Sequence, residues 1–280
     1  MTVPQRVGVY GGGRMGAGIA HTFLVAGAEA TIIETEDATV VAARERVLAS
    51  LGKAQERGGL TEPVDAVAAR LTVTADPTAL AACELVVEAV PEDAALKSRV
   101  LQLIEDSAPD AVIATNTSSL SIDQLAGDLV EPERFLGLHF FNPVPASDLV
   151  EIVVGVRTPG VLVAEAQGWV EALGKTAVTV TDSPGFASSR LGVAIALEAM
   201  RMLDEGVASA ADIDTAMTLG YRHPVGPLRT TDIVGLDVRL AIAEHLAREL
   251  GPRFEPPQVL RDLVAAGHLG RKTGRGFYSW

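Results

Sequence analysis

The sequence predicts an α/β fold with a doubly wound, mostly parallel sheet, followed by a smaller all-helical domain. Three observations point to this fold class. Short apolar runs alternate with helical patterns through the first two-thirds of the chain. A glycine-rich turn joins the first apolar run to the first helical pattern. After "TDSPGF" at residues 181–186, the strand-like runs stop and only helical spacing remains.

Strands are predicted where short runs rich in aliphatic and β-branched residues are bounded by turn residues. The expected strands are Arg6–Tyr10, Glu29–Glu34, Leu71–Ala75, Leu85–Val90, Ala111–Asn116, Phe135–Phe141, Asp148–Val154 and Thr176–Val180. Helical patterns lie between several of them, among them Ala38–Arg57 and Ala94–Ser107. Because parallel strands need crossover connections of this length, the alternation indicates βαβ units and a sheet covered on both faces.

The Pro-Gly break places a domain boundary between residues 182 and 183, which gives domains 1–182 and 183–280. In the second domain, Gly206 is a predicted helix C-cap, and Ser209 with Asp212 forms a helix-start signature. Further helices are expected at Val234–Leu250 and Gln258–Ala266. Because this helical tail is too short to bury all its apolar faces, helices such as Leu191–Leu203 are expected to pack on a second copy in a homodimer.

The composition excludes several classes of protein. A formal net charge of −13 argues against binding nucleic acid or anionic membranes. Cys83 is the single cysteine, so no intramolecular disulfide can form. Without a signal-peptide pattern or an apolar run long enough for a bilayer, the expected location is the cytoplasm. No metal site is predicted.

The glycine-rich turn is "GGGRMGAGIA", with Gly11, Gly13 and Gly16 in a G-x-G-x-x-G pattern between a strand and a helix. Gly11 permits the tight turn, Gly13 lets a pyrophosphate approach the backbone, and Gly16 permits close helix–strand packing. The diphosphate would lie on the helix N-terminus, at its unpaired N–H groups. A turn without a ligand is the alternative, but the strand–turn–helix context favours a Rossmann-type dinucleotide site.

Glu34 ends the second expected strand, where an acidic side chain accepts hydrogen bonds from the adenosine ribose. A carboxylate at this position repels a 2′-phosphate, so NAD is expected rather than NADP. The alternative for Glu34 is an exposed charge at a strand end.

His139 and Glu151 stand in two otherwise apolar strands of "GLHFFNPVPASDLVEIV". A lone histidine in a strand is more often a satisfied core residue, but three features favour a site. The chain has a hydride-transfer cofactor pattern, and Glu151 follows 12 positions after His139 across a proline turn. In addition, "NTSSL" at 116–120 falls at the carboxyl end of a sheet strand, where open α/β sheets bind ligands.

This pair suits the oxidation of an alcohol. Histidine can take the hydroxyl proton near neutral pH while hydride leaves carbon. A carboxylate on its other ring nitrogen fixes the tautomer and stabilises the imidazolium. Ser118 and Asn142 are then candidates for hydrogen bonds to a substrate oxygen or to the nicotinamide.

These residues stand in a longer series of ordered blocks that covers nearly the whole chain. The blocks are "GGGRMGAGIA", "LVVEAVPED", "ATNTSSLSI", "GLHFFNPVP", "LVEIV", "DSPGF", "DIDTAMTLGY", "GPLRTTDIVGLD" and "GRKTGRGFYSW". In the content and order of these blocks, the chain resembles the L-3-hydroxyacyl-CoA dehydrogenases, the class that includes 3-hydroxybutyryl-CoA dehydrogenases.

The resemblance implies roles for individual residues. His139 matches the catalytic base, Glu151 its partner, and Ser118 the serine that hydrogen-bonds the 3-oxygen of the substrate. Asn142 matches a contact on the nicotinamide side. Positions matching further cofactor contacts are Arg14, Met15, Glu92, Lys97 and Lys272, and positions matching the coenzyme A site are Ser50 and Arg57, with Ser118 at the acyl end. The alternatives are a solvated helix face for Ser50 and Arg57 and a surface role for Lys97 and Lys272.

Two departures from the family pattern bear on the substrate. "GFASSR" carries Ser189 where the family commonly has an asparagine that positions substrate and histidine. Serine still donates one hydrogen bond but lacks the second group of the amide. Ser147 and Asp148 replace the common Met and Lys, which makes this edge more polar and leaves the acyl-chain preference open.

The resemblance therefore implies an NAD-dependent (S)-3-hydroxyacyl-CoA dehydrogenase of the short-chain type, acting on an acyl-CoA thioester, with the helical domain contributing to the substrate cleft and to a homodimer. An enzyme acting on a carrier-bound acyl group or a free hydroxy acid is the alternative that Ser189 and Asp148 keep open. A non-catalytic NAD-binding protein is a third hypothesis. The intact set of Ser118, His139 and Glu151 argues against it.

Overall fold

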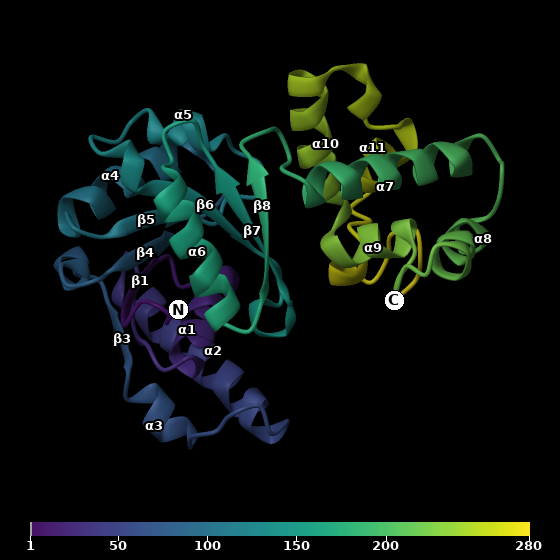
Figure 1. The fold of residues 1–280 in the computed structure, drawn as a ribbon. Coiled ribbons are helices and arrows are strands. Elements are labelled where there is room, and N and C mark those ends of the chain that lie inside the picture. The colour runs from purple at the N-terminus through teal and green to yellow at the C-terminus, as the bar shows by residue number, and fades with distance from the viewer. Residues whose placement is uncertain (1) are drawn as a thin grey trace. The chain divides into compact units, whose positions relative to one another are not determined.

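The computed structural model describes residues 2–280. The chain divides into two compact units, the first ending at Asp182 and the second running from Ser183 to Trp280. Figure 1 shows a sheet with its helices in the first unit and helices alone in the second. Among the described residues, no helix is both long and apolar enough to cross a membrane.

One eight-stranded sheet forms the centre of the first unit, in the order β3-β2-β1-β4-β5-β6-β7-β8. Its strands are β1 Arg6–Tyr10, β2 Glu29–Ile33, β3 Leu71–Thr74, β4 Leu85–Glu88, β5 Val112–Thr115, β6 Phe135–Phe140, β7 Leu149–Val154 and β8 Thr176–Thr181. The first six strands have the doubly wound order of dinucleotide-binding folds, with its reversal between β1 and β4. Only β6 and β7 pair antiparallel, so the predicted mostly parallel sheet is confirmed.

Helices connect these strands and pack on them (Figure 1). They are α1 Arg14–Val25, α2 Asp37–Glu56, α3 Val64–Ala68, α4 Ala94–Ser107, α5 Ile122–Ala126 and α6 Gly160–Ala172. The central strands β4 and β6 are buried along their whole length, as continuous apolar runs in a covered parallel sheet should be. β4 and β6 each carry one ionisable residue, Glu88 and His139. Both side chains are buried within the sheet.

The second unit has no named strand, and five of its helical elements are α-helices. They are α7 Ser188–Asp204, α8 Ala210–Thr215, α9 Pro227–Val234, α10 Leu236–Leu250 and α11 Gln258–Ala265. Ser209 caps α8 as predicted, because its hydroxyl accepts a hydrogen bond of 3.2 Å from the Asp212 N–H. Gly206 follows the end of α7 with a φ of +71°, a conformation that favours glycine.

The predicted helix Val234–Leu250 was wrong at its start, and α9 was not predicted. Val234 ends α9, and α10 begins only at Leu236. Gly235 between them has a φ of +110°, which breaks the helical path even though the apolar spacing continues across it. Pro227 opens α9 at a position where its missing N–H costs nothing.

Candidate functional site

The central pair of the candidate site joins β6 to β7. His139 lies directly opposite Glu151 in the antiparallel register, so both side chains share one face of the sheet. His139 Nδ1 is 2.8 Å from Glu151 Oε2. The two residues are only 6% and 1% exposed. Their mutual hydrogen bond offsets the cost of burying both, as the sequence suggested.

Glu92 organises the loop that follows β5. Its Oε1 accepts hydrogen bonds from Thr117 Oγ1 at 2.6 Å, from the Ser118 N–H at 2.9 Å and from the Ser119 N–H at 3.1 Å. The Ser118 hydroxyl also donates to this oxygen at 3.2 Å. Burial raises the pKa of Glu92, but the charge of Lys97 and these hydrogen bonds outweigh it and hold the pKa below its usual value. An ionised Glu92 therefore fixes Ser118 at the carboxyl end of the sheet.

Lys97 lies beneath this loop in a buried ion pair with Glu88. Its Nζ is 2.7 and 2.9 Å from the two Glu88 oxygens, and the side chains are 1% and 0% exposed. Nζ is also 3.5 Å from Glu92 Oε2, so one buried cation serves two carboxylates. Glu88 further accepts a hydrogen bond of 2.6 Å from Thr115 Oγ1 at the end of β5. The pair ties α4 to the ends of β4 and β5.

The glycine-rich turn between β1 and α1 fits a dinucleotide. Gly11 has a φ of +99°, and a Cβ at Gly16 would lie 1.8 Å from the Gly11 carbonyl oxygen, so both positions require glycine. Gly13 is the N-cap of α1, no side chain caps that helix, and a Cβ at Gly13 would meet no atom within 4 Å. A diphosphate can therefore approach the uncapped N-terminus of α1 closely. Met15, in the first turn, packs against the core.

Glu34 lies one residue beyond β2, beside this turn. Its Oε1 accepts a hydrogen bond of 2.7 Å from the Gly12 N–H. Arg46 of α2 donates to the Gly12 carbonyl oxygen at 3.1 Å. This bond through Oε1 holds the glycine-rich turn against the end of β2.

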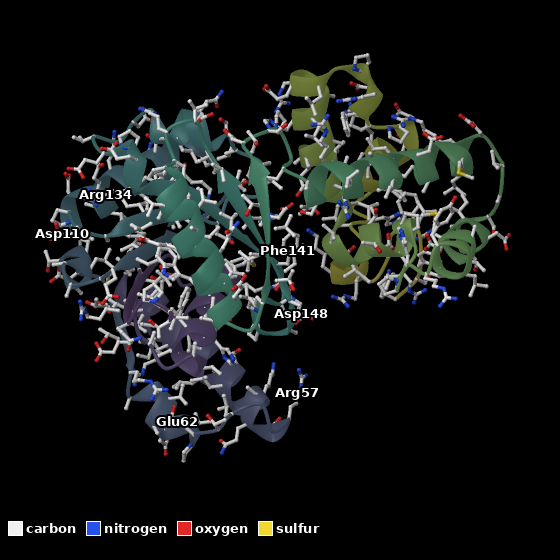
Figure 2. The ribbon with its side chains drawn as sticks, viewed as in Figure 1. Arg57, Glu62, Asp110, Arg134, Phe141 and Asp148 are labelled. Atoms are coloured by element: carbon white, nitrogen blue, oxygen red, sulfur yellow. The ribbon has the colours of Figure 1, made fainter. Side chains whose placement is uncertain are left out.

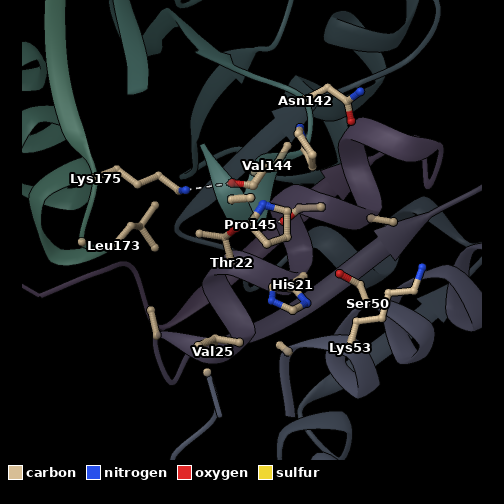
Figure 3. Close-up of a pocket in the computed structure, with 18 of the residues that line it drawn as sticks. His21, Thr22, Val25, Ser50, Lys53, Asn142, Val144, Pro145, Leu173 and Lys175 are labelled. Carbon is tan, nitrogen blue, oxygen red and sulfur yellow. Dashed lines mark hydrogen bonds between the residues drawn. The ribbon is translucent and has the colours of Figure 1, made fainter. Parts of the chain in front are cut away.

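A groove of about 1100 Å³ lies in the first unit between α1, α2, the turn after β6 and the segment before β8. Four of the residues predicted for a site line it, namely Arg14, Ser50, Arg57 and Asn142. Figure 2 shows Arg57 at the far end of α2, and Figure 3 shows Ser50, Lys53 and Asn142 around the groove. Its basic side chains are Arg14, Arg46, Lys53, Arg57 and Lys175. In a protein of net charge −13, this concentration of cations marks a place for an anionic ligand.

Lys175 holds the turn between β6 and β7 that carries Asn142. Its ammonium donates to the carbonyl oxygens of Val144 at 2.8 Å and Ser147 at 2.5 Å, and Figure 3 draws the first of these bonds. Burial lowers the pKa of Lys175, and the charge of Asp148 opposes that shift. Asp148, where the family pattern commonly has Lys, thus lies close enough to influence Lys175 in this chain.

Two predicted site residues belong to the second unit. Ser189 is in the first turn of α7. Lys272 donates to both carboxylate oxygens of Asp237, each at 2.6 Å. The structure therefore pairs Lys272 with a carboxylate of its own unit, and its role at the cofactor stays a prediction.

No role was predicted for Glu88, His21 or Lys175, and Asn116 was noted only as part of the "NTSSL" segment. The sequence does carry a signal for Glu88. It is an acidic residue at the end of an apolar strand, much as Glu34 directly follows one. Asn116 accepts a hydrogen bond of 2.9 Å from the Phe140 N–H and so links the end of β5 to β6 beside His139. His21 and Lys175 carry no local signal, since they reach the groove only through tertiary packing.

Residues 2–280 provide neither a metal site nor a cysteine nucleophile. No group of three or more His, Cys, Asp or Glu residues there could hold a metal ion. Cys83 is buried, and burial raises the pKa of its thiol to about 11, so it is not a nucleophile at neutral pH. The candidate centre is formed by Glu88 and Glu92 at and after the end of β4, by His139 near the end of β6, and by Glu151 on β7.

Comparison with known families matches both units. Residues 6–183 match the model of the 3-hydroxyacyl-CoA dehydrogenase NAD-binding domain. Residues 185–280 match the model of the 3-hydroxyacyl-CoA dehydrogenase C-terminal domain. Together the two models cover almost the entire chain.

Individual relatives agree with the family models. The chain is 43% identical over 281 residues to a 3-hydroxybutyryl-CoA dehydrogenase of Mycobacterium tuberculosis, covering 99% of this chain and 98% of that one. It is 38% identical to a 3-hydroxyadipyl-CoA dehydrogenase of Escherichia coli, covering 99% of this chain and 59% of that one. The crystal structure of an (S)-3-hydroxybutyryl-CoA dehydrogenase from Ralstonia eutropha superimposes with a TM-score of 0.94 at 40% identity, covering 99% of each chain. The chain belongs to the 3-hydroxyacyl-CoA dehydrogenase family, and its first unit is the NAD-binding domain.

Proposed function

We propose that the protein interconverts (S)-3-hydroxyacyl-CoA and 3-oxoacyl-CoA thioesters of short chain length, with NAD as the redox cofactor. The observation that carries this proposal is the buried pair of His139 and Glu151, 2.8 Å apart, at the carboxyl end of a sheet strand in an NAD-binding domain. Family membership and the 3-hydroxybutyryl-CoA dehydrogenases among the relatives support the same reaction.

His139 is proposed as the general base. Bound NAD supplies the hydride acceptor, and the protein has to manage the proton of the 3-hydroxyl group. Because Glu151 holds Nδ1, the lone pair of Nε2 takes this proton as the alcohol is oxidised. The buried carboxylate of Glu151 then stabilises the imidazolium, and the same atoms return the proton when a 3-oxoacyl group is reduced.

Ser118, Asn142 and Ser189 are proposed to orient the substrate and the nicotinamide. The backbone N–H of Ser118 holds this residue on Glu92, so its hydroxyl can turn from Glu92 and donate its hydrogen bond to the 3-oxygen. Asn142 lies in the turn held by Lys175. Ser189 is proposed to donate the single hydrogen bond that remains when serine replaces the family asparagine.

The coenzyme A moiety is proposed to bind the basic groove of the first unit. Ser50 and Arg57 line this groove with Lys53, three positions after Ser50 on α2. Arg57, the C-cap of α2, follows Lys53 by four positions. Residues three or four positions apart lie on one face of a helix, so Lys53 and Arg57 can bind phosphates in succession. This supports a coenzyme A thioester over a free hydroxy acid, which has no phosphate to pair with these cations.

The cofactor site is proposed to consist of the glycine turn, Glu34 and flanking residues. Gly11, Gly13, Gly16 and Glu34 would hold the dinucleotide. Further proposed contacts are Arg14, Met15, Glu92, Lys97 and Lys272. A homodimer and a cytoplasmic location belong to the same proposal, and exposed Leu191 and Ile195 of α7 support the first.

The assay that tests this function follows NADH absorbance with four substrates. These are acetoacetyl-CoA, 3-oxoadipyl-CoA, a carrier-linked acetoacetyl group and free acetoacetate. We expect turnover with the coenzyme A thioesters and the highest kcat/KM with acetoacetyl-CoA. Turnover with the free acid alone, or with the carrier-linked group alone, would overturn the coenzyme A assignment.

Cofactor choice gives a second prediction. The wild-type enzyme should prefer NADH to NADPH in kcat/KM, because the Glu34 carboxylate repels a 2′-phosphate. Glu34→Gln keeps an oxygen for the Gly12 N–H but removes the charge, so it should reduce the preference by about 10-fold, or about 1.4 kcal/mol. Glu29→Gln, at the exposed opposite end of β2, is the matched control and should leave the preference unchanged. A wild-type preference for NADPH would contradict the role of Glu34.

A further inference from the structure

His21 is a buried polar residue that the proposed mechanism does not use. It lies on α1 and is only 4% exposed. Its Nδ1 atom is buried and has no hydrogen-bond partner among the residues that the structure describes. Because an unsatisfied buried nitrogen destabilises a fold, a histidine held in this state points to a ligand that completes its hydrogen bonds.

His21 lies in the middle of the basic groove. Gly18, one helical turn before it, packs against the turn after β6, since a Cβ at Gly18 would lie 2.9 Å from Val144 Cβ. His21 therefore follows this contact along the same face of α1. Figure 3 shows its ring between Pro145 and the α2 residues Ser50 and Lys53. In Figure 3 the imidazole lies between Asn142 and Lys53. Arg57 follows Lys53 by one helical turn, at the C-cap of α2, and lines the same groove.

His21 is neutral in its surroundings. The pKa of its imidazole is lowered to about 4, mainly by burial and to a smaller extent by the positive charge of Lys175. A neutral imidazole offers one N–H donor and one nitrogen acceptor. A phosphate presents only acceptors, so it suits the cations of the groove. An amide presents one C=O and one N–H and matches the imidazole.

We propose that His21 binds an amide of the pantetheine arm of the acyl thioester. This inference rests on the proposed function and adds a residue that recognises the neutral part of the substrate. The arm joins the reacting acyl group to the nucleotide phosphates, and the groove has the same order. Figure 3 shows His21 between Asn142 and Lys53, and Arg57 lines the groove one helical turn after Lys53.

The competing explanation is that His21 only fills the core. Leucine has a similar volume and no polar atom to satisfy, so His21→Leu would then leave binding unchanged. It would also raise the stability, since it removes an unsatisfied nitrogen. For a binding residue, the same substitution should weaken substrate binding while the melting temperature stays the same or rises by about 2–4 °C.

The test compares His21→Leu, His21→Gln and the wild type with acetoacetyl-CoA and acetoacetyl-pantetheine. We expect His21→Leu to raise KM about 10-fold for both thioesters, with kcat and the KM for NADH within about 2-fold. His21→Gln supplies a donor and an acceptor again and should stay within about 3-fold of the wild type. His268→Leu, which changes a histidine of the second unit, is the matched control and should change none of these values.

Two results would overturn the inference. An unchanged KM for both thioesters would show that His21 is a core residue. A raised KM for acetoacetyl-CoA alone would assign His21 to the nucleotide instead of the arm. Calorimetric titration with coenzyme A gives a readout that does not need turnover, and His21→Leu should weaken this binding about 10-fold. Absent turnover by the wild type would contradict the proposed function, while the titration would still decide the role of His21.

Discussion

His139→Gln is expected to lower kcat for acetoacetyl-CoA reduction by about 10²–10⁴-fold, with little change in KM. Glutamine can keep a hydrogen bond to Glu151, 2.8 Å from the native ring, but its amide does not exchange a proton near neutral pH. The reaction then loses its acid–base group while the substrate groove stays intact. The decay of NADH absorbance under saturating substrate measures the change.

Glu151→Gln separates the charge of the partner from its geometry. The amide oxygen can still accept the Nδ1–H bond, but no negative charge opposes the imidazolium, so kcat should fall by about 10–10³-fold. His223→Gln, in the second unit, is the matched control and should leave kcat unchanged. Full activity of His139→Gln in a folded protein would contradict the proposed base.

Lys97→Met is expected to lower the free energy of unfolding by about 3–5 kcal/mol. The substitution leaves the Glu88 carboxylate, which is 0% exposed, without its cation and next to Glu92. Methionine fills much of the volume, so the loss reports an uncompensated buried charge rather than a cavity. Urea unfolding followed by circular dichroism measures the difference.

A double-mutant cycle with Glu88→Gln tests the cause of this loss. Lys97→Met combined with Glu88→Gln removes both charges, so it should be markedly more stable than Lys97→Met alone. The control is Arg261→Met, which breaks ion pairs with Glu244 and Glu255 at the surface and should cost about 1 kcal/mol or less. If Lys97→Met costs no more than this control, Lys97 is not a structural cation, and its effect on the KM for NADH would then define its role.

The sequence was sufficient for the order of the elements and for the central pair. Continuous apolar runs placed the eight strands within two residues of their observed ends, because burial on both faces leaves a local pattern. The glycine turn was recognisable because Gly11 and Gly16 each satisfy a steric need that no other residue meets. His139 and Glu151 could be paired because a short turn between two strands restricts which residues face each other.

The helical unit was less predictable. Apolar spacing continues from α9 into α10, so the pattern gives no sign that Gly235 interrupts it. Whether a glycine breaks a helix or only weakens it depends on what packs around it. Gly235 lies beside Asp237 and Lys272. Lys272 is distant along the chain, so the local sequence pattern does not reveal this contact.

The sequence by itself determined the fold class, the glycine-rich turn and the pairing of His139 with Glu151, since each depends on periodicity or on residues close along the chain. Tertiary structure alone decided which polar side chains from separate elements come together. Lys97 forms a buried ion pair with Glu88 and is not a surface residue. Glu92 binds the loop that carries Ser118, and His21 lines the basic groove. The reason is physical. Burial strengthens electrostatic interactions only where separate elements enclose them, and that enclosure is a property of the packed chain.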